Sequence, residues 1–304
     1  MTSVHLDTSS HLDATAAADV LALAGRAADA DGVDAISEAF RLALTSARAE
    51  VSHVAAYAAQ SRLVGYAALD AAGSAELVVD PDARRQGVGR ALVRTLFASQ
   101  QVAKGVWAHG DLPAARALAA AEGLVSTREL HVMARVVAPG DDVDPVLPEG
   151  FSVRAFEPGR DEQAWLEVNG LAFASHPEQG SITLQDLQDR MAQDWFDPAG
   201  LLLVEDTTVT AADGNHPLAA SHWTKREPGS STGEVYVVGV HPAYQGRGLA
   251  GPLTGLGTAH LARQGVDAID LYVDGDNTRA LATYRRAGFE DAAIHVVYGR
   301  PSAP

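Results

Sequence analysis

The stretch that decides the fold is Gly233-Glu234-Val235-Tyr236-Val237-Val238-Gly239-Val240-His241-Pro242-Ala243-Tyr244-Gln245-Gly246-Arg247-Gly248-Leu249-Ala250-Gly251. Residues 235–240 are β-branched, aromatic or glycine, which predicts an interior strand. Pro242 ends that strand because proline cannot donate to a strand ladder. Gly246 and Gly248 leave backbone N–H groups unobstructed at a helix start, where the helix dipole favours a phosphate group. The stretch therefore predicts a buried strand, a turn and an anion-binding loop.

A second copy of this pattern lies in the first half of the chain. Residues 75–90 again give a strand, a proline turn, a glycine-rich loop and a helix start, and Arg84-x-x-Gly87-x-Gly89 matches Gln245-x-x-Gly248-x-Ala250 at an offset of 161 residues. A constant offset of about half the chain indicates a tandem duplication. We therefore predict two α/β domains with mixed (α+β) sheets, at 1–138 and 151–304. The Pro-, Gly- and Asp-rich segment 139–150 is the predicted linker.

The composition is that of an ordinary globular protein. The 304 residues suit two domains, and 47% are hydrophobic and 20% charged. No apolar run reaches the ~18 residues of a membrane span, and the N-terminus shows no signal-peptide pattern. Because cysteine is absent, disulfides, thiolate metal sites and cysteine nucleophiles are excluded. We expect a cytoplasmic protein.

The charge and the metal-ligating residues restrict the partners. A net charge of −16 disfavours nucleic acid, which needs clustered Lys and Arg. It is compatible with a cationic small substrate, or it is simply an acidic surface. No His and carboxylate cluster has metal-ligand spacing, so no metal is expected. We expect a monomer that binds neither nucleic acid nor membrane.

The apolar patterns predict the same order of elements in both halves. Helices are expected at 11–30, 34–48, 88–99, 113–122, 161–173, 183–191, 247–263 and 277–287. Strands are expected at 51–58, 63–69, 77–79, 105–109, 129–137, 151–154, 201–205, 216–223, 233–240, 268–273 and 292–298.

Two motifs in the second half resemble one enzyme family. The spacing Gln245-x-x-Gly248-x-Ala250 is similar to the pyrophosphate loop of the GCN5-related N-acetyltransferases, and residues 277–284 fit their second pattern, Asn-x-x-Ala-x-x-x-Tyr. The resemblance implies that fold in both halves and acetyl-CoA as cosubstrate. In that family the tyrosine, here Tyr284, lies beside the CoA sulfur, and the asparagine, here Asn277, helps to hold the pantetheine arm.

Two residues carry the expected chemistry. Acetyl transfer to an amine needs a deprotonated amine, a hydrogen-bond donor for the oxyanion and an acid near the departing thiolate. Glu234 begins the central strand and is the candidate base, although it could equally be a solvated carboxylate at a strand end. Tyr284 is the candidate acid, and the alternative is a tyrosine that only packs.

The first half keeps the loop but not these residues. The offset places Gly73 opposite Glu234, and aligning Gly123 with Gly288 places Ala119 opposite Tyr284 and Leu112 opposite Asn277. We therefore expect a degenerate copy that binds acetyl-CoA or CoA without catalysis. The alternative is a purely structural relic.

Further segments narrow the resemblance to the mycothiol synthase family. They are 165–180, 195–200, 222–225, 233–240 and 271–277. That family acetylates the cysteinyl amine of cysteinyl-glucosaminyl-inositol in the last step of mycothiol synthesis. Two departures are Ser181-Ile182, where an aromatic residue is usual, and His241, where Asp is usual before proline. The alternatives are an acetyltransferase for another small amine or a peptide terminus, and a non-catalytic acetyl-CoA-binding module.

The resemblance also implies the site residues. Substrate contacts are expected at Glu38, Glu178, Lys225, Glu234 and Tyr272. Acetyl-CoA contacts are expected in the second half at Val238, Gly239, Val240, Gln245, Gly246, Arg247, Gly248, Leu249, Ala250, Gly251, Asn277, Thr278, Arg279, Ala280, Leu281 and Ala282. In the first half they are expected at Leu77, Val78, Val79, Arg84, Gly87 and Gly89.

Overall fold

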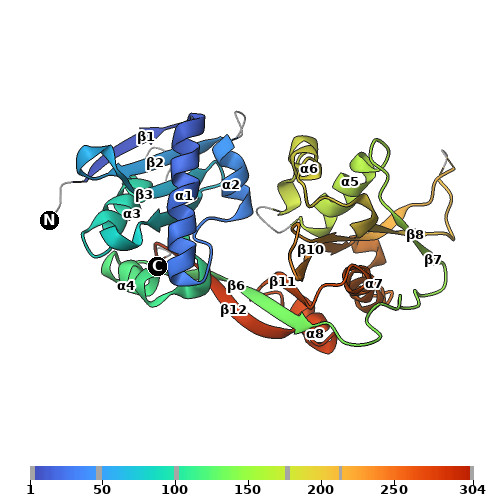
Figure 1. Ribbon diagram of the computed structural model, residues 1–304. Helices are drawn as coiled ribbons and strands as arrows, with labels where there is room; N and C mark the ends of the chain where they lie inside the picture. Colours follow the sequence, from blue (N-terminus) through green and yellow to red (C-terminus); the bar gives the residue numbers. More distant parts are fainter. Residues whose placement is uncertain (1–3, 46–49, 99–102, 175–178, 212–213, 302–304) are drawn as a thin grey trace. The chain divides into compact units, whose positions relative to one another are not determined.

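The computed structural model describes residues 4–45, 50–98, 103–174, 179–211 and 214–301. The chain forms two compact units (Figure 1). Unit 1 comprises residues 1–130 and 293–304, and unit 2 comprises residues 131–292. The prediction of two α/β units with mixed sheets is confirmed. The expected linker at 139–150 stays a prediction, and no helix or strand is described between Val136 and Phe151.

Unit 1 is a mixed sheet covered by helices on both faces. Its strands follow the order β1-β2-β3-β4-β5-β12. The elements are β1 (His5–Ser9), α1 (Ala14–Asp31), α2 (Glu38–Thr45), β2 (Val51–Tyr57), β3 (Leu63–Asp70), β4 (Ser74–Val79), α3 (Val88–Ala98), β5 (Gly105–Ala108), α4 (Pro113–Ala121) and, shared with unit 2, β6 (Val125–Val136) and β12 (Glu290–Gly299).

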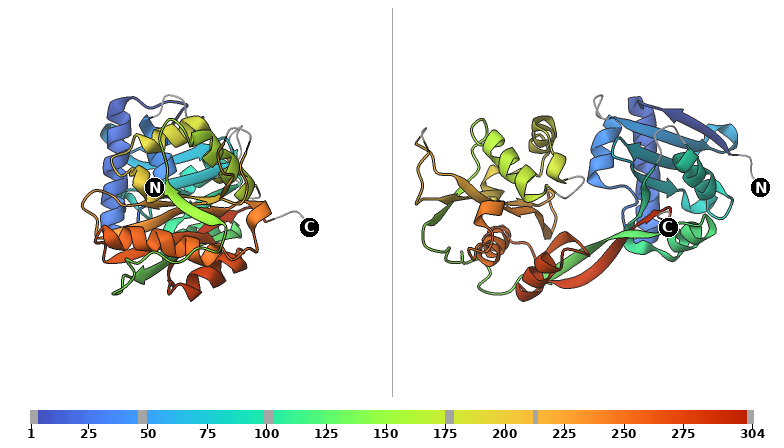
Figure 2. Two further views of the ribbon diagram at one scale, coloured as in Figure 1. Left: turned by 90° about the vertical axis from the view of Figure 1, so that its right-hand side faces the viewer. Right: turned by 180° about the vertical axis from the view of Figure 1, so that it is seen from behind.

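Two apolar layers hold unit 1 together. Val20 and Leu23 of α1 pack with Phe40 of α2 against Tyr66 and Val78 on one face of the sheet. On the other face, α3 buries its own apolar stripe against β2–β4. Figure 2 shows unit 1 from behind, with α3 over the face opposite α1. Both helices are amphipathic, so burial of one stripe each fixes them on the sheet.

Unit 2 repeats this arrangement. Its strands follow the order β7-β8-β9-β10-β11-β6. The elements are β7 (Phe151–Ala155), α5 (Glu162–Ala172), α6 (Leu184–Met191), β8 (Leu201–Asp206), β9 (Leu218–Lys225), β10 (Thr232–Val240), α7 (Ala250–Arg263), β11 (Ala268–Asp274) and α8 (Thr278–Arg286).

The two faces of the unit 2 sheet carry different cores. Trp165 of α5 and Leu187 of α6 pack against Trp223 and Val237 on the first face. Leu261 of α7 and Leu281 of α8 belong to the core of the second face. In Figure 1, α5 and α6 lie on one side of the strands and α7 on the other. We call these the α5/α6 face and the α7/α8 face.

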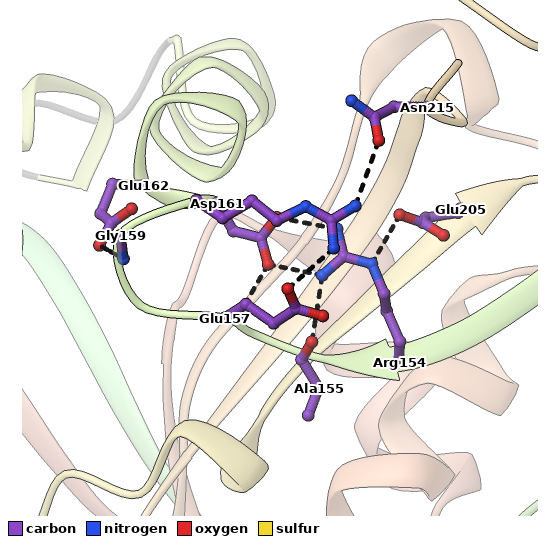
Figure 3. A network of polar contacts seen from close by, with 9 residues as sticks. Arg154, Ala155, Glu157, Gly159, Asp161, Glu162, Glu205 and Asn215 are labelled. Atoms are coloured by element: carbon purple, nitrogen blue, oxygen red, sulfur yellow. Dashed lines mark hydrogen bonds and ion pairs between the residues drawn. The ribbon is translucent and has the colours of Figure 1, made fainter. Parts of the chain in front are cut away.

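A partly buried arginine network fixes the start of α5 to the sheet (Figure 3). Arg154 on β7 donates to both carboxylate oxygens of Asp161, at 2.5 and 2.8 Å, and to Glu205 of β8 at 2.7 Å. The carboxyl of Asp161 also accepts from the Glu157 backbone N–H at 2.8 Å. The network is structural, because charge-assisted fork contacts of this kind hold their partners in one geometry.

The two copies exchange their last strands. Val296–Gly299 of β12, at the end of the second copy, pair antiparallel with Gly105–Ala108 of β5 in unit 1. Residues 131–136 of β6, at the end of the first copy, belong to unit 2. There Arg135 donates to the Ala287 carbonyl at 2.7 Å. Each unit is therefore completed by a strand from the other copy.

Most predicted elements are confirmed, although several ends differ. The strand β1 was not expected, β4 begins at Ser74 rather than residue 77, and β6 begins at Val125 rather than residue 129. α2 begins at Glu38 rather than residue 34, and α7 begins at Ala250 rather than residue 247. The later start of α7 has a physical cause, since Gly246 and Gly248 both take φ +80°, which interrupts helical geometry. In the described residues no helix is long and apolar enough to cross a membrane.

Candidate active site

The central feature of unit 2 is a fork between two parallel strands. β10 and β11 pair only from Thr232–Val235 to Ala268–Leu271, although β10 continues to Val240. In the described chain, residues 236–240 have no partner on β11. A bulge at Tyr236 shifts the register of β10 against β9 between Val235 and Val237. Bulges re-aim side chains and increase strand twist, which separates the two strands at this point.

The fork exposes the backbone where the cofactor was expected. The residues Val238, Gly239 and Val240 lie on β10 beyond the last parallel pair. On that side their backbone N–H and C=O groups are open to a ligand that completes the ladder. Gly239 is also tightly packed, because a Cβ there would lie 3.1 Å from the Ala172 Cβ.

The loop after β10 has the geometry of an anion site. Gly246 and Gly248 take φ +80°, and residues 245–248 are exposed. Gln245 donates from Nε2 to the Val240 carbonyl at 3.3 Å, which ties the loop to the strand end. Leu249 is the N-cap of α7, and Gly251 is in its first turn. Left-handed glycines at a helix start turn N–H groups outward, so these residues fit the diphosphate of acetyl-CoA.

Three ionisable side chains form a row beside the fork. Glu234 on β10 has Lys225 on β9 and Asp270 on β11 as its Cα partners. Their neighbours Val235, Ile269 and Leu271 belong to the core of the α7/α8 face. Since side chains alternate along a strand, the row lies on the α5/α6 face. Glu234 is partly buried there, directly before the bulge.

Lys225 is buried in an aromatic setting. Only 8% of the residue is exposed, and its Nζ lies 5.0 Å from the ring centre of Trp195 and 5.5 Å from that of Tyr236. It also forms an ion pair with Glu227 at 3.1 Å. Arg190 of α6 donates to the Tyr236 hydroxyl at 2.9 Å. This environment holds the ammonium group by cation–π contacts and fixes its position.

Tyr284 lies on the other face of the sheet, in the core that includes Val235 and Leu271. It lies on α8 in the core of the α7/α8 face, 8% exposed, with its ring 6.0 Å from that of Phe289. Burial raises the pKa of the Tyr284 hydroxyl to about 12. In the described part of the chain this hydroxyl makes no hydrogen bond. It is therefore a protonated donor at neutral pH without a structural partner.

Most of the other predicted residues of unit 2 lie in exposed positions. Asn277 caps α8, since its side chain accepts from the Ala280 N–H at 3.1 Å. Thr278 and Arg279 are exposed beside it, while Leu281 is buried. Tyr272 on β11 is 47% exposed. Its alternation with Leu271 places it on the α5/α6 face, two residues after Asp270.

Two predicted substrate contacts are not placed in this site. Glu178 lies outside the described residues. Glu38 belongs to unit 1, where it is the first residue of α2. Among the described residues no group of His, Asp and Glu could hold a metal ion.

The unit 1 loop repeats the unit 2 loop in detail. Arg84 donates from Nε to the Val79 carbonyl, as Gln245 does to Val240. Asp80 accepts from the Asp82 N–H, and His241 accepts at Nδ1 from the Ala243 N–H in the same way. His241 therefore makes the same capping hydrogen bond to the turn that Asp80 makes in unit 1.

The cofactor positions of unit 1 are arranged like those of unit 2. β4 pairs parallel to β5 only at Ser74 and Ala75, so Leu77, Val78 and Val79 lie beyond that pairing. Gly87 takes φ +93° before α3. A Cβ on Gly89 would lie 3.2 Å from Leu118 of α4. Arg84 itself is bound by both oxygens of Asp31 at 2.7 Å.

The strand register corrects the identity of the unit 1 residue that corresponds to Glu234. β4 has no bulge, so Leu69 pairs with Ala75 where Thr224 pairs with Val235. Ser74, and not Gly73, therefore stands at the place of Glu234, because the bulge at Tyr236 adds one residue to β10. The Ser74 hydroxyl accepts from the Trp107 indole N–H at 3.1 Å.

Unit 1 has no acid or base at the two reactive positions. The α4 residue opposite Tyr284 is the buried Ala119, and Leu112 stands at the N-cap of α4 where Asn277 caps α8. A carboxylate two residues after Ser74, Glu76, is 3% exposed and accepts from the Ser37 N–H at 2.7 Å. Its other oxygen is 3.1 Å from Nε2 of His109, so Glu76 is used inside the core.

Comparisons with known proteins agree with the two copies. A model described as the acetyltransferase (GNAT) family matches residues 165–289, and a GNAT domain model matches residues 50–123. A solved tandem GNAT protein from the clavulanic acid biosynthesis pathway has a TM-score of 0.71 at 18% identity and covers 99% of both chains. A GCN5-related N-acetyltransferase from Sphaerobacter thermophilus has a TM-score of 0.66 at 23% identity, covering 98% of this chain and 97% of that one.

Relatives with much higher identity extend over nearly the whole chain. A mycothiol acetyltransferase of Kytococcus sedentarius is 50% identical over 282 residues, which cover 92% of each chain. A mycothiol acetyltransferase of Streptomyces bingchenggensis is 46% identical and covers 96% of each chain. The chain is thus an acetyl-CoA-dependent acetyltransferase with a small-molecule acceptor, and it belongs to the mycothiol acetyltransferase family.

Proposed function

We propose that the chain transfers the acetyl group of acetyl-CoA to the cysteinyl amine of 1D-myo-inositol 2-(L-cysteinylamino)-2-deoxy-α-D-glucopyranoside, the last step of mycothiol synthesis. The identity of the acceptor is inferred from relatives that are mycothiol acetyltransferases and that match this chain over 92% and 96% of both lengths. The observation that supports the chemistry is that Glu234 lies in the row before the last pair, Val235 and Leu271, while Tyr284 belongs to the core that contains this pair on the other face of the sheet.

Glu234 acts as the base. The acceptor amine has a pKa of about 8, so at neutral pH it arrives mostly as an ammonium ion without a lone pair. Glu234 lies at the last row before β10 and β11 separate, on the α5/α6 face. A carboxylate at this place removes the proton directly or through one water molecule.

Tyr284 acts as the acid. Its hydroxyl stays protonated because burial raises the tyrosine pKa to about 12. It donates its proton to the sulfur that leaves, which prevents the build-up of an unstable buried thiolate. The proton lost by Tyr284 returns from solvent after the product has left.

The residues of the fork and the loop would hold acetyl-CoA. The backbone of Val238–Val240 pairs with the pantetheine arm, and residues 245–251 bind the diphosphate at the start of α7. Asn277–Ala282 line the same arm from α8. Acetyl-CoA supplies an activated thioester carbonyl when bound.

The acceptor is held by polar side chains on the α5/α6 face. Lys225 donates to sugar hydroxyls, and Tyr272 offers a hydroxyl and an exposed ring. Glu178 and Glu38 are further predicted contacts, supported by the family resemblance alone. Carboxylates suit both hydroxyl donors and the ammonium group.

We also propose that unit 1 binds acetyl-CoA or CoA without catalysis. Its loop and strand end repeat those of unit 2, while Ser74 and Ala119 replace the base and the acid. We further propose a cytoplasmic monomer that binds neither nucleic acid nor membrane. The support is the absence of cysteine and the net charge of −16.

A CoA-release assay tests the acceptor. Purified chain is incubated with acetyl-CoA and either the cysteinyl pseudodisaccharide or a panel of small amines and peptides, and free thiol is measured. We expect kcat/KM for the pseudodisaccharide to exceed that of every other amine by at least about 100-fold, because a polyol acceptor gains several specific hydrogen bonds. No turnover with the pseudodisaccharide would refute the proposed acceptor.

A further inference from the structure

Asp270 is a second carboxylate beside Glu234. The two residues are Cα partners on the parallel strands β11 and β10, in the row directly before the last pair, Val235 and Leu271. Partners in register place their side chains on the same face of a sheet, about 5 Å apart at the backbone. Asp270 therefore stands at the fork, on the face where Glu234 meets the acceptor.

No structural role accounts for the Asp270 carboxylate. It is partly buried, and in the described part of the chain it forms no hydrogen bond or ion pair with another side chain. Burial raises the pKa of this carboxyl, against the opposing effects of its own backbone N–H and of the Lys225 charge. A half-buried carboxylate that has the charge of Lys225 nearby, but no side-chain hydrogen bond or ion pair among the described residues, is costly to keep, so its position calls for a function.

Few other titratable or charged side chains lie near Asp270 on the α5/α6 face. β9 contributes Lys225, β10 contributes Glu234 and Tyr236, and β11 itself contributes Tyr272. Arg190 of α6 is bound to the Tyr236 hydroxyl, and Glu227 is paired with Lys225. On β6, the neighbour of β11, Met133 faces the α7/α8 core, so alternation gives this face the apolar Val132 and Ala134.

We propose that Asp270 is a further functional residue of the acetyl transfer: it takes over the proton that Glu234 removes from the acceptor ammonium and passes it to solvent. In the first step R–NH₃⁺ and the Glu234 carboxylate give R–NH₂ and the Glu234 acid. In the second step the proton moves from Glu234 to the Asp270 carboxylate, directly or through one water molecule. Water or buffer base then removes it, which restores both carboxylates.

This assignment gives Lys225 a second task. Its positive charge, fixed over Trp195 and Tyr236, opposes the rise that burial causes in the pKa of Asp270. The exposed Tyr272, two residues further along β11, marks the side from which solvent reaches Asp270. The inference rests on the proposed function insofar as Glu234 is the base.

The kinetic test compares Asp270→Asn with the matched control Asp267→Asn. Asp267 is an exposed carboxylate three residues earlier on the same segment. At pH 6.5 we expect Asp270→Asn to lower kcat/KM for the amine about 10- to 100-fold, within the usual range of acid–base contributions. At pH 9 the amine is already neutral in solution, so the deficit should shrink to less than about 3-fold. Asp267→Asn and the KM for acetyl-CoA should stay at wild-type values, and Asp270→Glu should recover most of the rate.

An equal deficit of Asp270→Asn at both pH values would overturn the proposal, as would a wild-type rate at pH 6.5. Any amine that the wild-type chain acetylates serves in this comparison. If the pseudodisaccharide is not an acceptor, the wild-type chain itself does not acetylate it. That outcome is distinct from a refutation of the role of Asp270, which is measured with any accepted amine.

A second experiment does not depend on turnover, and its first part needs only the wild-type chain. Carboxyl ¹³C shifts of the wild-type chain, followed from pH 3 to 8, should show Glu234 and Asp270 titrating in two coupled steps, as neighbouring carboxylates do. In folded Asp270→Asn the Glu234 midpoint should move to lower pH because a negative neighbour is lost. Independent single-step titration of both groups in the wild type would overturn the proposal.

Discussion

At the scale of single residues, Tyr284 and Glu234, the proposed acid and base, lie on opposite faces of one sheet. Tyr284 belongs to the core between β11 and α8, where water is excluded and its proton is held firmly. Glu234 is only partly buried and has Lys225 as its partner on β9. The motif Asn277–Tyr284 made Tyr284 predictable from the sequence. The environment of Lys225, with Trp195 and Tyr236, was not, because it depends on residues from three separate segments.

Tyr284→Phe should lower turnover more than affinity. The ring packs against Phe289 in either variant, so the core is kept and only the proton donor is lost. We expect kcat to fall about 100-fold or more, with the Kd for acetyl-CoA changed less than about 3-fold. Steady-state kinetics and calorimetric titration measure the two quantities. An equal loss of both would show that Tyr284 is a packing residue.

At the scale of elements, the arginine network of β7 holds the start of α5 (Figure 3). Burial alone would raise the pKa of the Asp161 carboxyl, but the hydrogen bonds from Arg154 and from the Glu157 N–H lower it below its usual value. A carboxyl whose pKa is lower in the folded state stabilises the fold above its unfolded pKa, about 3.9. That stabilisation is lost as the pH falls through the folded pKa.

Arg154→Met should therefore destabilise unit 2 in a pH-dependent way. At pH 7 it leaves Asp161 buried without its partner, which we expect to cost about 3 kcal/mol. As the pH falls through the lowered pKa of Asp161, the carboxyl is protonated and the difference should become much smaller. Urea unfolding followed by tryptophan fluorescence reports mainly unit 2, which holds Trp165, Trp195 and Trp223. The exposed pair of Arg285 with Asp291, which lies in unit 2 apart from this network, gives the control Arg285→Met, with an expected change under about 0.5 kcal/mol. A pH-independent cost of Arg154→Met would contradict the assignment.

The elements also show how far the sequence predicts the fold. The apolar runs located all strands but β1, whose residues His5–Ser9 include only one apolar side chain and form an edge strand. The bulge at Tyr236 has no sequence signal, because Val235–Val240 is uniformly strand-forming. The bulge nevertheless opens the fork and shifts the counterpart of Glu234 from Gly73 to Ser74. Asp270 could not be found from the sequence either, because its place beside Glu234 depends on the register between β10 and β11.

At the scale of the whole molecule, two copies share one fold but differ in what they can do. The loops, turns and strand ends agree down to the hydrogen bonds of Arg84 and Gln245. The exchange of β6 and β12 could not be predicted, because each strand sequence fits either sheet edge. It makes each unit depend on a strand from the other copy. The duplication therefore gives two glycine-rich loops of the same geometry, and the proposed acid and base occur at the fork of unit 2, where unit 1 has Ala119 and Ser74.

The measurement that tests this account most directly is the acetyl-transfer rate of Glu234→Gln beside that of Ser74→Ala, its counterpart in unit 1. The amide of glutamine keeps the shape of Glu234 but cannot accept the proton. We predict that Glu234→Gln lowers kcat/KM for the amine about 100- to 1,000-fold at pH 7, while Ser74→Ala stays within about 2-fold of the wild type. A wild-type rate in Glu234→Gln, or an equal loss in Ser74→Ala, would contradict the claim that the reaction takes place at the fork of unit 2.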